Sequence, residues 1–224
     1  VASYGEVVAG LPASLFEAEI TRVTQGQDER LLDFSQLRQL TRSFLGLYET
    51  HAGRPFPQDA REQLSGAIEA VFASWNADKA VQYRRIHQID HDMGTAVILQ
   101  RMVFGNTGGH SGAGVGFTRD PGTGEPRLWV DFLANAQGED VVSGRRNAHG
   151  HATLAAVAPD AWKQLQASAQ ALEQHFGDMQ DFEFTVQDGV LHMLQTRSAK
   201  RTPLAAARIA LDLLDEGLID SAEA

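Results

Sequence analysis

The chain has 224 residues, of which 43% are hydrophobic and 21% charged, the composition of a globular protein long enough to bury a sizeable core. Its 19 basic and 29 acidic residues give a formal charge of -10, which argues against a nucleic-acid partner bound through a basic surface. The absence of cysteine excludes disulfides and thiol nucleophiles and favours a cytoplasmic location, and no apolar run approaches the roughly 18 residues that a membrane helix needs.

The first 92 residues predict a mainly helical subdomain. One helix is expected over residues 14–23, and a second begins at Ser35 as its N-cap and stops at Gly53. A third follows Asp59, which can cap it, and carries apolar residues every three or four positions up to Trp75. These stripes predict packing between helices, with a partner-binding groove as the alternative.

Residues 93–200 have the texture of a β-rich subdomain, and residues 201–224 that of a C-terminal helix. β-branched and aromatic residues are concentrated in the expected strands, and Pro and Gly mark the expected ends of the helices. The predicted elements are strands at 95–104, 115–118 and 127–133, a helix at 159–177, a hairpin at 181–197 and a helix from Thr202 to about Gly217. The fold class is therefore α+β, with an antiparallel sheet, flanking helices and an inserted all-helical subdomain.

The predicted hairpin is the most informative segment. Strand periodicity puts Asp181 and Glu183 on one face and the neighbouring phenylalanines on the other. A three-residue loop at 187–189 places Gln195 and Arg197 on the face of the two acids, whereas a two-residue loop slips the second strand and buries Arg197 among the rings. The cost of burying a guanidinium favours the three-residue loop.

Two carboxylates one pleat apart suit a hard divalent cation, and a nearby arginine can clamp the phosphates that such a cation bridges. Asp181, Glu183 and Arg197 therefore point to Mg²⁺ with a nucleoside triphosphate. A solvated strand face with a cross-strand ion pair remains the alternative.

Residues 105–116 contain six glycines but lack the Gly-Lys-Ser/Thr ending of a P-loop. They are interpreted either as a flap that closes over phosphates or as an ordinary flexible loop. The pairs His87/His91 and His149/His151 have no further ligands at metal spacing, and His110 lies in the loop with no evident group to orient its ring.

Several longer motifs together resemble the pyruvate, phosphate dikinase family. They are Met-Val-Phe-Gly-Asn at 102–106, Ser-Gly-Ala-Gly-Val at 111–115, Phe-Thr-Arg at 117–119, Asn-Ala-Gln-Gly-Glu-Asp-Val-Val at 135–142, Met-Gln-Asp-Phe-Glu-Phe-Thr at 179–185 and Leu-Gln-Thr-Arg at 194–197. The block at 135–140 separates this family from the related pyruvate, water dikinases, and matching stretches reach from residue 4 to residue 219. Because the chain opens at Val1 without a methionine, a piece of a longer protein is expected.

The resemblance implies the later portion of an ATP-grasp domain that binds Mg²⁺ and ATP as substrate. It further implies a homodimer and partner domains of the same protein, one carrying a phosphorylated histidine and one binding pyruvate, so this portion alone is expected to be inactive. The implied site residues are Asp181 and Glu183 for the metal, Gln100, Met102, Asp131, Gln195 and Arg197 for the nucleotide, and Glu139 with Arg197 for catalysis.

Two positions depart from the family pattern, since Ala113 stands where Thr is usual and Asp131 where Glu is usual. A lost hydroxyl and a shortened carboxylate weaken phosphate or ribose contacts. Two alternatives therefore stay open: a sister dikinase that uses water or another acceptor, and a degenerate ATP-grasp remnant that acts as a non-catalytic binding or regulatory module.

Overall fold

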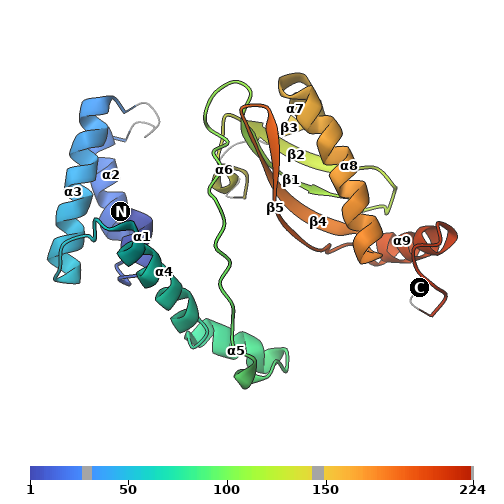
Figure 1. Cartoon of the computed structure of the whole chain (residues 1–224), viewed down its shortest axis with the longest axis horizontal. Coiled ribbons are helices and arrows are strands. Elements are labelled where there is room, and N and C mark those ends of the chain that lie inside the picture. Colours follow the sequence, from blue (N-terminus) through green and yellow to red (C-terminus); the bar gives the residue numbers. More distant parts are fainter. Residues whose placement is uncertain (27–31, 143–148, 223–224) are drawn as a thin grey trace. The chain divides into compact units, whose positions relative to one another are not determined.

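A computed structural model describes residues 1–26, 32–142 and 149–222 (Figure 1). Its internal contacts divide the chain into two compact units, Val1–Gln100 and Arg101–Ala224, and each is considered separately below. The first is helical and the second contains a sheet with helices. None of the helices in the described ranges is long and apolar enough to cross a membrane.

The first unit is built from short amphipathic helices around an aromatic cluster. Its elements are α1 (Ala2–Val7), α2 (Ala13–Thr24), α3 (Phe34–Ala52), α4 (Ala60–Ser74), α5 (Asp78–Ile86) and the 3-10 helix η2 (His91–Met93). Tyr48 is fully buried, and Phe56 packs edge-on against both Tyr48 and Tyr4. Edge-to-face packing of this kind adds stability beyond the buried area itself.

The helix starts in this unit test the capping predictions directly. Asp59 caps α4 as predicted, accepting from the backbone N–H groups of Arg61 and Glu62. The prediction for α3 is wrong by two residues, because Asp33 and not Ser35 is the cap and forms a reciprocal capping box with Gln36. In this box the Asp33 carboxylate accepts from the backbone N–H of Gln36, and the Gln36 side chain accepts from the backbone N–H of Asp33. Two backbone donors at the start of the helix are thereby satisfied.

The predicted packing stripe of α4 is only partly covered. The helix has no buried residue, and Leu64 and Val71 are exposed.

The second unit is a five-stranded antiparallel sheet with the order β3-β2-β1-β4-β5. Its strands are β1 (Gly112–Phe117), β2 (Trp129–Ala134), β3 (His149–Gly150), β4 (Gln180–Gln187) and β5 (Val190–Ser198). Its helices are α6 (Gly138–Val142), α7 (His151–Val157), α8 (Pro159–Phe176) and α9 (Pro203–Asp215). Helix α8 runs across one face of the sheet (Figure 1), and α9 packs Ile209 and Leu213 with Met179 in a smaller cluster.

Glycines in β1 shape the main core. Val130, Phe132, Phe182 and Phe184 of the flanking strands pack against α7 and α8. A Cβ at Gly114 would lie 2.4 Å from the Phe184 ring and 2.7 Å from the backbone oxygen of Asp131, and Gly112 and Gly116 are equally close to phenylalanine rings. These residues are therefore part of a packed strand, where large side chains on either side need a neighbour without a Cβ.

The predicted strand at 95–104 is wrong. These residues form no ladder with the described part of the chain, and Ile98, Leu99 and Met102 have 87%, 65% and 66% of their surface exposed. Their β-branched composition favours extended backbone, but a strand also needs a partner for its backbone groups, and the first residue of the sheet is Gly112.

The glycine-rich loop is anchored at several points, and the returning strand predicted at 115–118 forms as the end of β1, which begins earlier, at Gly112. The Thr107 and Ser111 hydroxyl oxygens lie 2.7 Å apart, and Ser111 Oγ accepts from the backbone N–H of Asp188 at 3.0 Å. The N–H of Gly189 in turn donates to His110 O at 2.9 Å. Residues 105–111 are thereby tied to the turn between β4 and β5.

Candidate functional site

The turn between β4 and β5 has two residues, Asp188 and Gly189, with φ of 51° and 81°. The predicted three-residue loop is therefore wrong, because both residues adopt the left-handed backbone that a tight type I′ turn requires. Without any correction this turn would send Arg197 to the core face. A β-bulge opposite Glu183 and Phe184 inserts Leu194, so that Glu183 pairs with Gln195 and Asp181 with Arg197.

The predicted consequence thus holds by a different route: the two acids share a face with Gln195 and Arg197. This face is the one opposite the core of α7 and α8, since Phe182 and Phe184 alternate with the acids along β4. A three-residue loop would have paired Glu183 with Met193 and Asp181 with Gln195. The observed partners lie two residues further along β5, one because of the shorter turn and one because of the bulge.

Two rows of paired residues cross the site face. One row runs Trp129, Phe117, Asp181, Arg197 from β2 to β5, and the next runs Asp131, Val115, Glu183, Gln195. Val115 of β1 thus lies between Asp131 and Glu183 in the second row. Two strand spacings place the two backbones roughly 10 Å apart.

The Asp181–Arg197 pair is the centre of the site. Arg197 Nε donates to Asp181 Oδ2 at 2.8 Å, and Arg197 Nη2 lies 4.0 Å from Glu183 Oε1. The Arg197 side chain is 58% exposed, against 16% for Asp181 and 35% for Glu183. The hydrogen bond and the charge of Asp181 raise the pKa of Arg197, so this open face carries a fixed cation between two carboxylates.

The acids fit a divalent ion that a nucleotide brings with it. Asp181 and Glu183 stand on one face of β4, two residues or about 7 Å apart along the strand. A carboxylate has about four acceptor positions, so Asp181 can accept from Arg197 and still ligate a cation. Among the described residues no group of three or more His, Asp or Glu could hold a metal. Mg²⁺ usually needs only one or two carboxylates beside phosphate oxygens and water.

The remaining predicted residues are not brought to this pair by any described contact. Glu139 is exposed in the first turn of α6, a helix that contacts β1, β2 and β4. Gln100 ends the first unit, and Met102 is exposed at the start of the second. Asp131 is half-buried in the second row, as described above.

The departure at Ala113 lies on the site face. Ala113 is 1% exposed and pairs with Leu133 on one side and with Thr185 on the other. A threonine there would bring a second hydroxyl beside the buried Thr185, so the alanine removes a polar group from the floor of the face.

None of the contacts described for His87, His91 and His110 involves the Asp181–Arg197 pair. His110 Nδ1 lies 3.0 Å from Val157 O, which corrects the expectation that nothing orients its ring. His91 Nδ1 contacts Arg84 Nη2 at 3.1 Å, and His87 stacks against Tyr83. The side chain of His149 lies outside the described residues.

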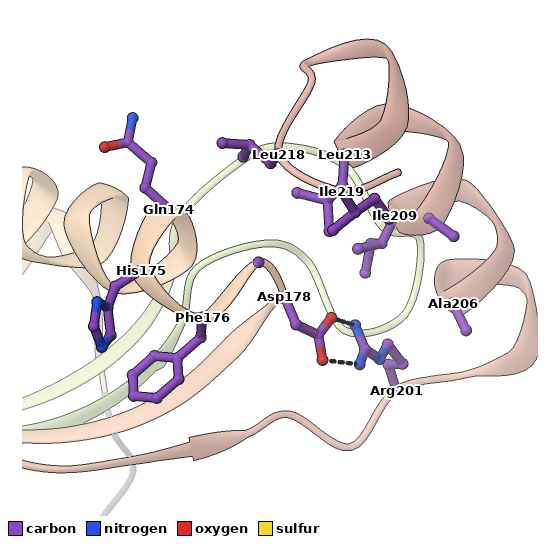
Figure 2. Close-up of a pocket in the computed structure, with 12 residues that line it drawn as sticks. Gln174, His175, Phe176, Asp178, Arg201, Ala206, Ile209, Leu213, Leu218 and Ile219 are labelled. Atoms are coloured by element: carbon purple, nitrogen blue, oxygen red, sulfur yellow. Dashed lines mark hydrogen bonds and ion pairs between the residues drawn. The ribbon is translucent and has the colours of Figure 1, made fainter. Parts of the chain in front are cut away.

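A hollow of about 540 Å³ lies elsewhere, between the end of α8 and α9 (Figure 2). Ile209 and Leu213 form part of its apolar lining, together with the Asp178–Arg201 ion pair. It contains none of the predicted site residues. The chemistry of Asp181, Glu183 and Arg197 therefore belongs to an open sheet face and not to this cavity.

Four residues that sequence reasoning did not assign lie directly behind the site: Thr118, Arg119, Glu173 and Gln180. Arg119 is only 1% exposed and bonds Glu173, which also accepts from the Thr118 hydroxyl. The sequence signals for Arg119 were its place at a strand end and in the Phe-Thr-Arg motif, and neither could reveal a partner 54 residues away.

Comparison with known proteins identifies the family of the chain. The family model described as "Pyruvate phosphate dikinase, AMP/ATP-binding domain" matches residues 38–151 and 149–217. Pyruvate, phosphate dikinase of Clostridium symbiosum is 46% identical over 99% of this chain and 26% of that protein. The chloroplastic enzyme of Mesembryanthemum crystallinum is 45% identical over 97% of this chain and 23% of its own length. Pyruvate, phosphate dikinase 2 of Zea mays is 44% identical over 97% and 25%, respectively.

The chain thus spans about a quarter of the length of these relatives. The family match covers both units and includes the strands that carry Asp181, Glu183 and Arg197. The chain belongs to the pyruvate phosphate dikinase family and corresponds to its AMP/ATP-binding domain.

Proposed function

We propose that this chain binds ATP with Mg²⁺ and supplies a phosphoryl group to a histidine on another domain of the same protein. The complete protein then converts pyruvate, ATP and phosphate to phosphoenolpyruvate, AMP and pyrophosphate. The single observation that carries the proposal is the Asp181–Arg197 pair with Glu183 beside it on the face of the sheet that the core leaves open.

Each side chain has a role that follows from its chemistry. Asp181 and Glu183 hold the metal ion, which when bound neutralises charge on the phosphates. Arg197 offers a planar set of donors that suits two phosphate oxygens at once, and its exposed guanidinium can turn from Asp181 towards a ligand. Gln195, opposite Glu183, contributes neutral donors and acceptors to the nucleotide.

Glu139 and Asp131 take secondary roles in this proposal. Helix α6 packs over β1, β2 and β4, so the exposed Glu139 stands at the border of the site face. Asp131 lies in the row of Glu183 and is suited to a ribose or a water in the coordination shell. Met102 and Gln100, in the extended segment before the sheet, are assigned to the adenine end.

The relatives named above support pyruvate and phosphate as co-substrates over a water-using sister enzyme. The dimer and the pyruvate-binding and phosphohistidine domains rest on the same likeness. Chloroplastic relatives occur beside the bacterial one, so the cytoplasmic location stays a prediction.

The test is magnesium-dependent ATP binding in Asp181→Asn and Glu183→Gln, with Asp160→Asn on α8 as control. Asp160 is 83% exposed and pairs with Lys163, away from the site. Loss of a ligating charge is expected to weaken binding by about tenfold or more in both site variants and to leave binding without metal nearly unchanged. Normal Mg²⁺-dependent binding in both variants would contradict the proposed metal pair.

A further inference from the structure

We infer that Gln180 is a positioning residue that fixes the register of the Asp181–Arg197 pair. This inference rests on the proposed function, because it assigns the means by which the site face is held. Gln180 is the first residue of β4 and is only 2% exposed. Its side chain lies on the face opposite Asp181, so it touches no ligand of the site and acts through the backbone.

The amide of Gln180 bonds the two strands that carry the site. Its Oε1 accepts from the Thr196 hydroxyl at 3.2 Å, while its Nε2 donates to the backbone oxygens of Asp178 and Met179 at 3.1 and 3.3 Å. Thr196 Oγ1 also lies 3.4 Å from Asp181 O. Since Gln180 precedes Asp181 and Thr196 precedes Arg197, one partly buried hydrogen bond joins the residues immediately before both members of the pair.

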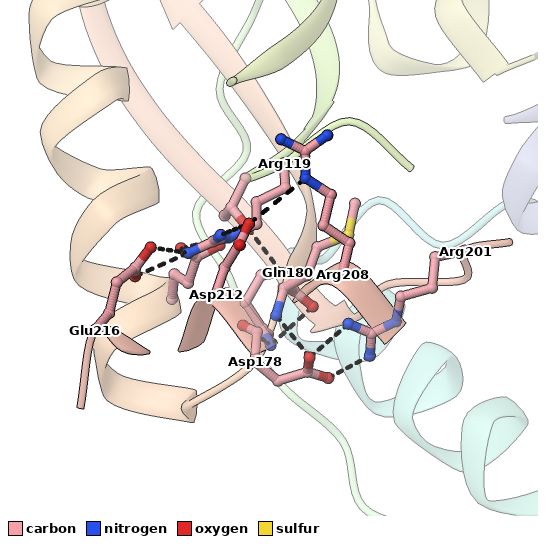
Figure 3. A network of polar contacts seen from close by, with 10 residues as sticks. Arg119, Asp178, Gln180, Arg201, Arg208, Asp212 and Glu216 are labelled. Atoms are coloured by element: carbon pink, nitrogen blue, oxygen red, sulfur yellow. Dashed lines mark hydrogen bonds and ion pairs between the residues drawn. The ribbon is translucent and has the colours of Figure 1, made fainter. Parts of the chain in front are cut away.

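A second set of bonds holds Gln180 from the side of β1. The backbone N–H of Gln180 donates to Thr118 Oγ1 at 3.0 Å, and that hydroxyl donates to Glu173 Oε2 at 2.7 Å. Arg119 in turn fixes Glu173 with Nε and Nη2 at 3.0 and 2.8 Å, and its Nη2 reaches Glu216 Oε2 beyond α9 at 2.9 Å. Figure 3 shows Gln180 among these charged neighbours, between Arg119 and the Asp178–Arg201 pair.

This position needs a register contact because β5 is an edge strand in the described sheet and its ladder is interrupted by the bulge at Leu194. Beyond the bulge only four pairs, from Glu183–Gln195 to Gln180–Ser198, keep the strand aligned. A slip of one residue would turn Arg197 to the core face. In the observed register the Thr196 hydroxyl donates to Oε1 of the buried Gln180 side chain. A slipped register would move Thr196 away and leave this acceptor without its hydrogen bond.

Register can be measured without any nucleotide, since the chain has no cysteine of its own. Asp181→Cys combined with Arg197→Cys places two thiols on directly opposed residues, whose Cα atoms lie about 4.5–5.5 Å apart and within disulfide reach. Adding Gln180→Met, which has nearly the same volume and no hydrogen bonds, is expected to slow cross-linking about fivefold. Adding Thr202→Val, which removes the N-cap of α9, is the matched control and is expected to leave the rate unchanged.

The functional consequence is measured by titrating Mn²⁺–ATP against single variants and recording thermal midpoints of the same samples. Gln180→Met and Thr196→Val are expected to bind about 5- to 20-fold more weakly, as loss of one or two hydrogen bonds allows. Thr196→Ser keeps the hydroxyl and is expected to bind like the unmodified protein. Thr202→Val loses thermal stability without losing affinity.

Unchanged cross-linking in the Gln180→Met background would overturn the inference, whatever the nucleotide data show. Equal losses of affinity in Gln180→Met and Thr202→Val would also overturn it, because the effect would then be general destabilisation. If the unmodified protein binds no Mn²⁺–ATP, the proposed function fails, while the cross-linking result still decides whether Gln180 sets the register.

Discussion

Replacing Arg197 with lysine separates a ligand contact from a merely structural ion pair. Lysine keeps the positive charge but loses the planar set of donors, so it can still face Asp181 and cannot make two parallel bonds to a phosphate. The Arg197 side chain is 58% exposed, and an exposed ion pair contributes only about 0–1 kcal/mol to stability. For a chain of this size the thermal midpoint is therefore expected to fall by no more than about 4 °C.

The expected loss of binding is larger than the loss of stability. Hydrogen bonds to charged groups contribute about 1.5–3 kcal/mol each. Loss of one of them corresponds to roughly a 10- to 150-fold weaker affinity, at 1.4 kcal/mol per factor of ten. A phosphate contact and a merely structural ion pair therefore predict affinities that differ by an order of magnitude or more, while the midpoint falls by only a few degrees in either case.

The assay titrates Mg²⁺–ATP and records thermal midpoints on the same preparation of Arg197→Lys. Arg127→Lys is the matched control, because Arg127 is 68% exposed and pairs with Asp120 at 3.2 Å away from the site. We expect Arg197→Lys alone to lose affinity. Near-normal affinity with a small drop in midpoint, as in the control, would refute a phosphate role for Arg197.

Two further predictions concern the bulge and an ion pair in the first unit. Deleting Leu194 removes the bulge but leaves Arg197 on the site face, so Mg²⁺–ATP binding is expected to survive. Deleting Thr196 instead turns Arg197 to the core face and is expected to abolish Mg²⁺–ATP binding. Equal binding by the two deletion variants would contradict the assigned register. Hydrogen bonds from Arg22 and Ser43 lower the pKa of Glu19 to about 2, below the 4.5 of the unfolded chain, so its contribution to stability is complete above pH 4.5 and is lost as pH falls towards 2. The difference in thermal midpoint between the protein and Glu19→Gln is expected to shrink over that range, and a difference that persists at pH 2 would exclude this linkage.

Local sequence patterns predicted most elements because their causes are local. Pro159 and Gly177 bound α8, Thr202 caps α9, and Asp59 caps α4, each through contacts within a few residues of the chain. Alternation along β4 placed the acids opposite the phenylalanines for the same reason, since side chains of a strand point to the two faces in turn.

Tertiary structure decided what depends on partners distant in sequence. The segment at 95–104 has the composition of a strand but no partner for its backbone among the described residues. Residues 112–114 read as part of a flexible loop, yet they begin a central strand, because large rings on the neighbouring strands require glycines there. Strand propensity describes one chain segment, and pairing is a property of two.

The site face itself combines both kinds of information. The sequence alone determined which residue types stand one pleat apart at Asp181 and Glu183, and their resemblance to a known motif assigned them a metal. Only the folded sheet could place Arg197 beside them, because that depends on a two-residue turn and a compensating bulge whose register is set against β4. The buried bonds of Gln180 and Thr118 join residues up to 62 positions apart, so no local pattern contained them.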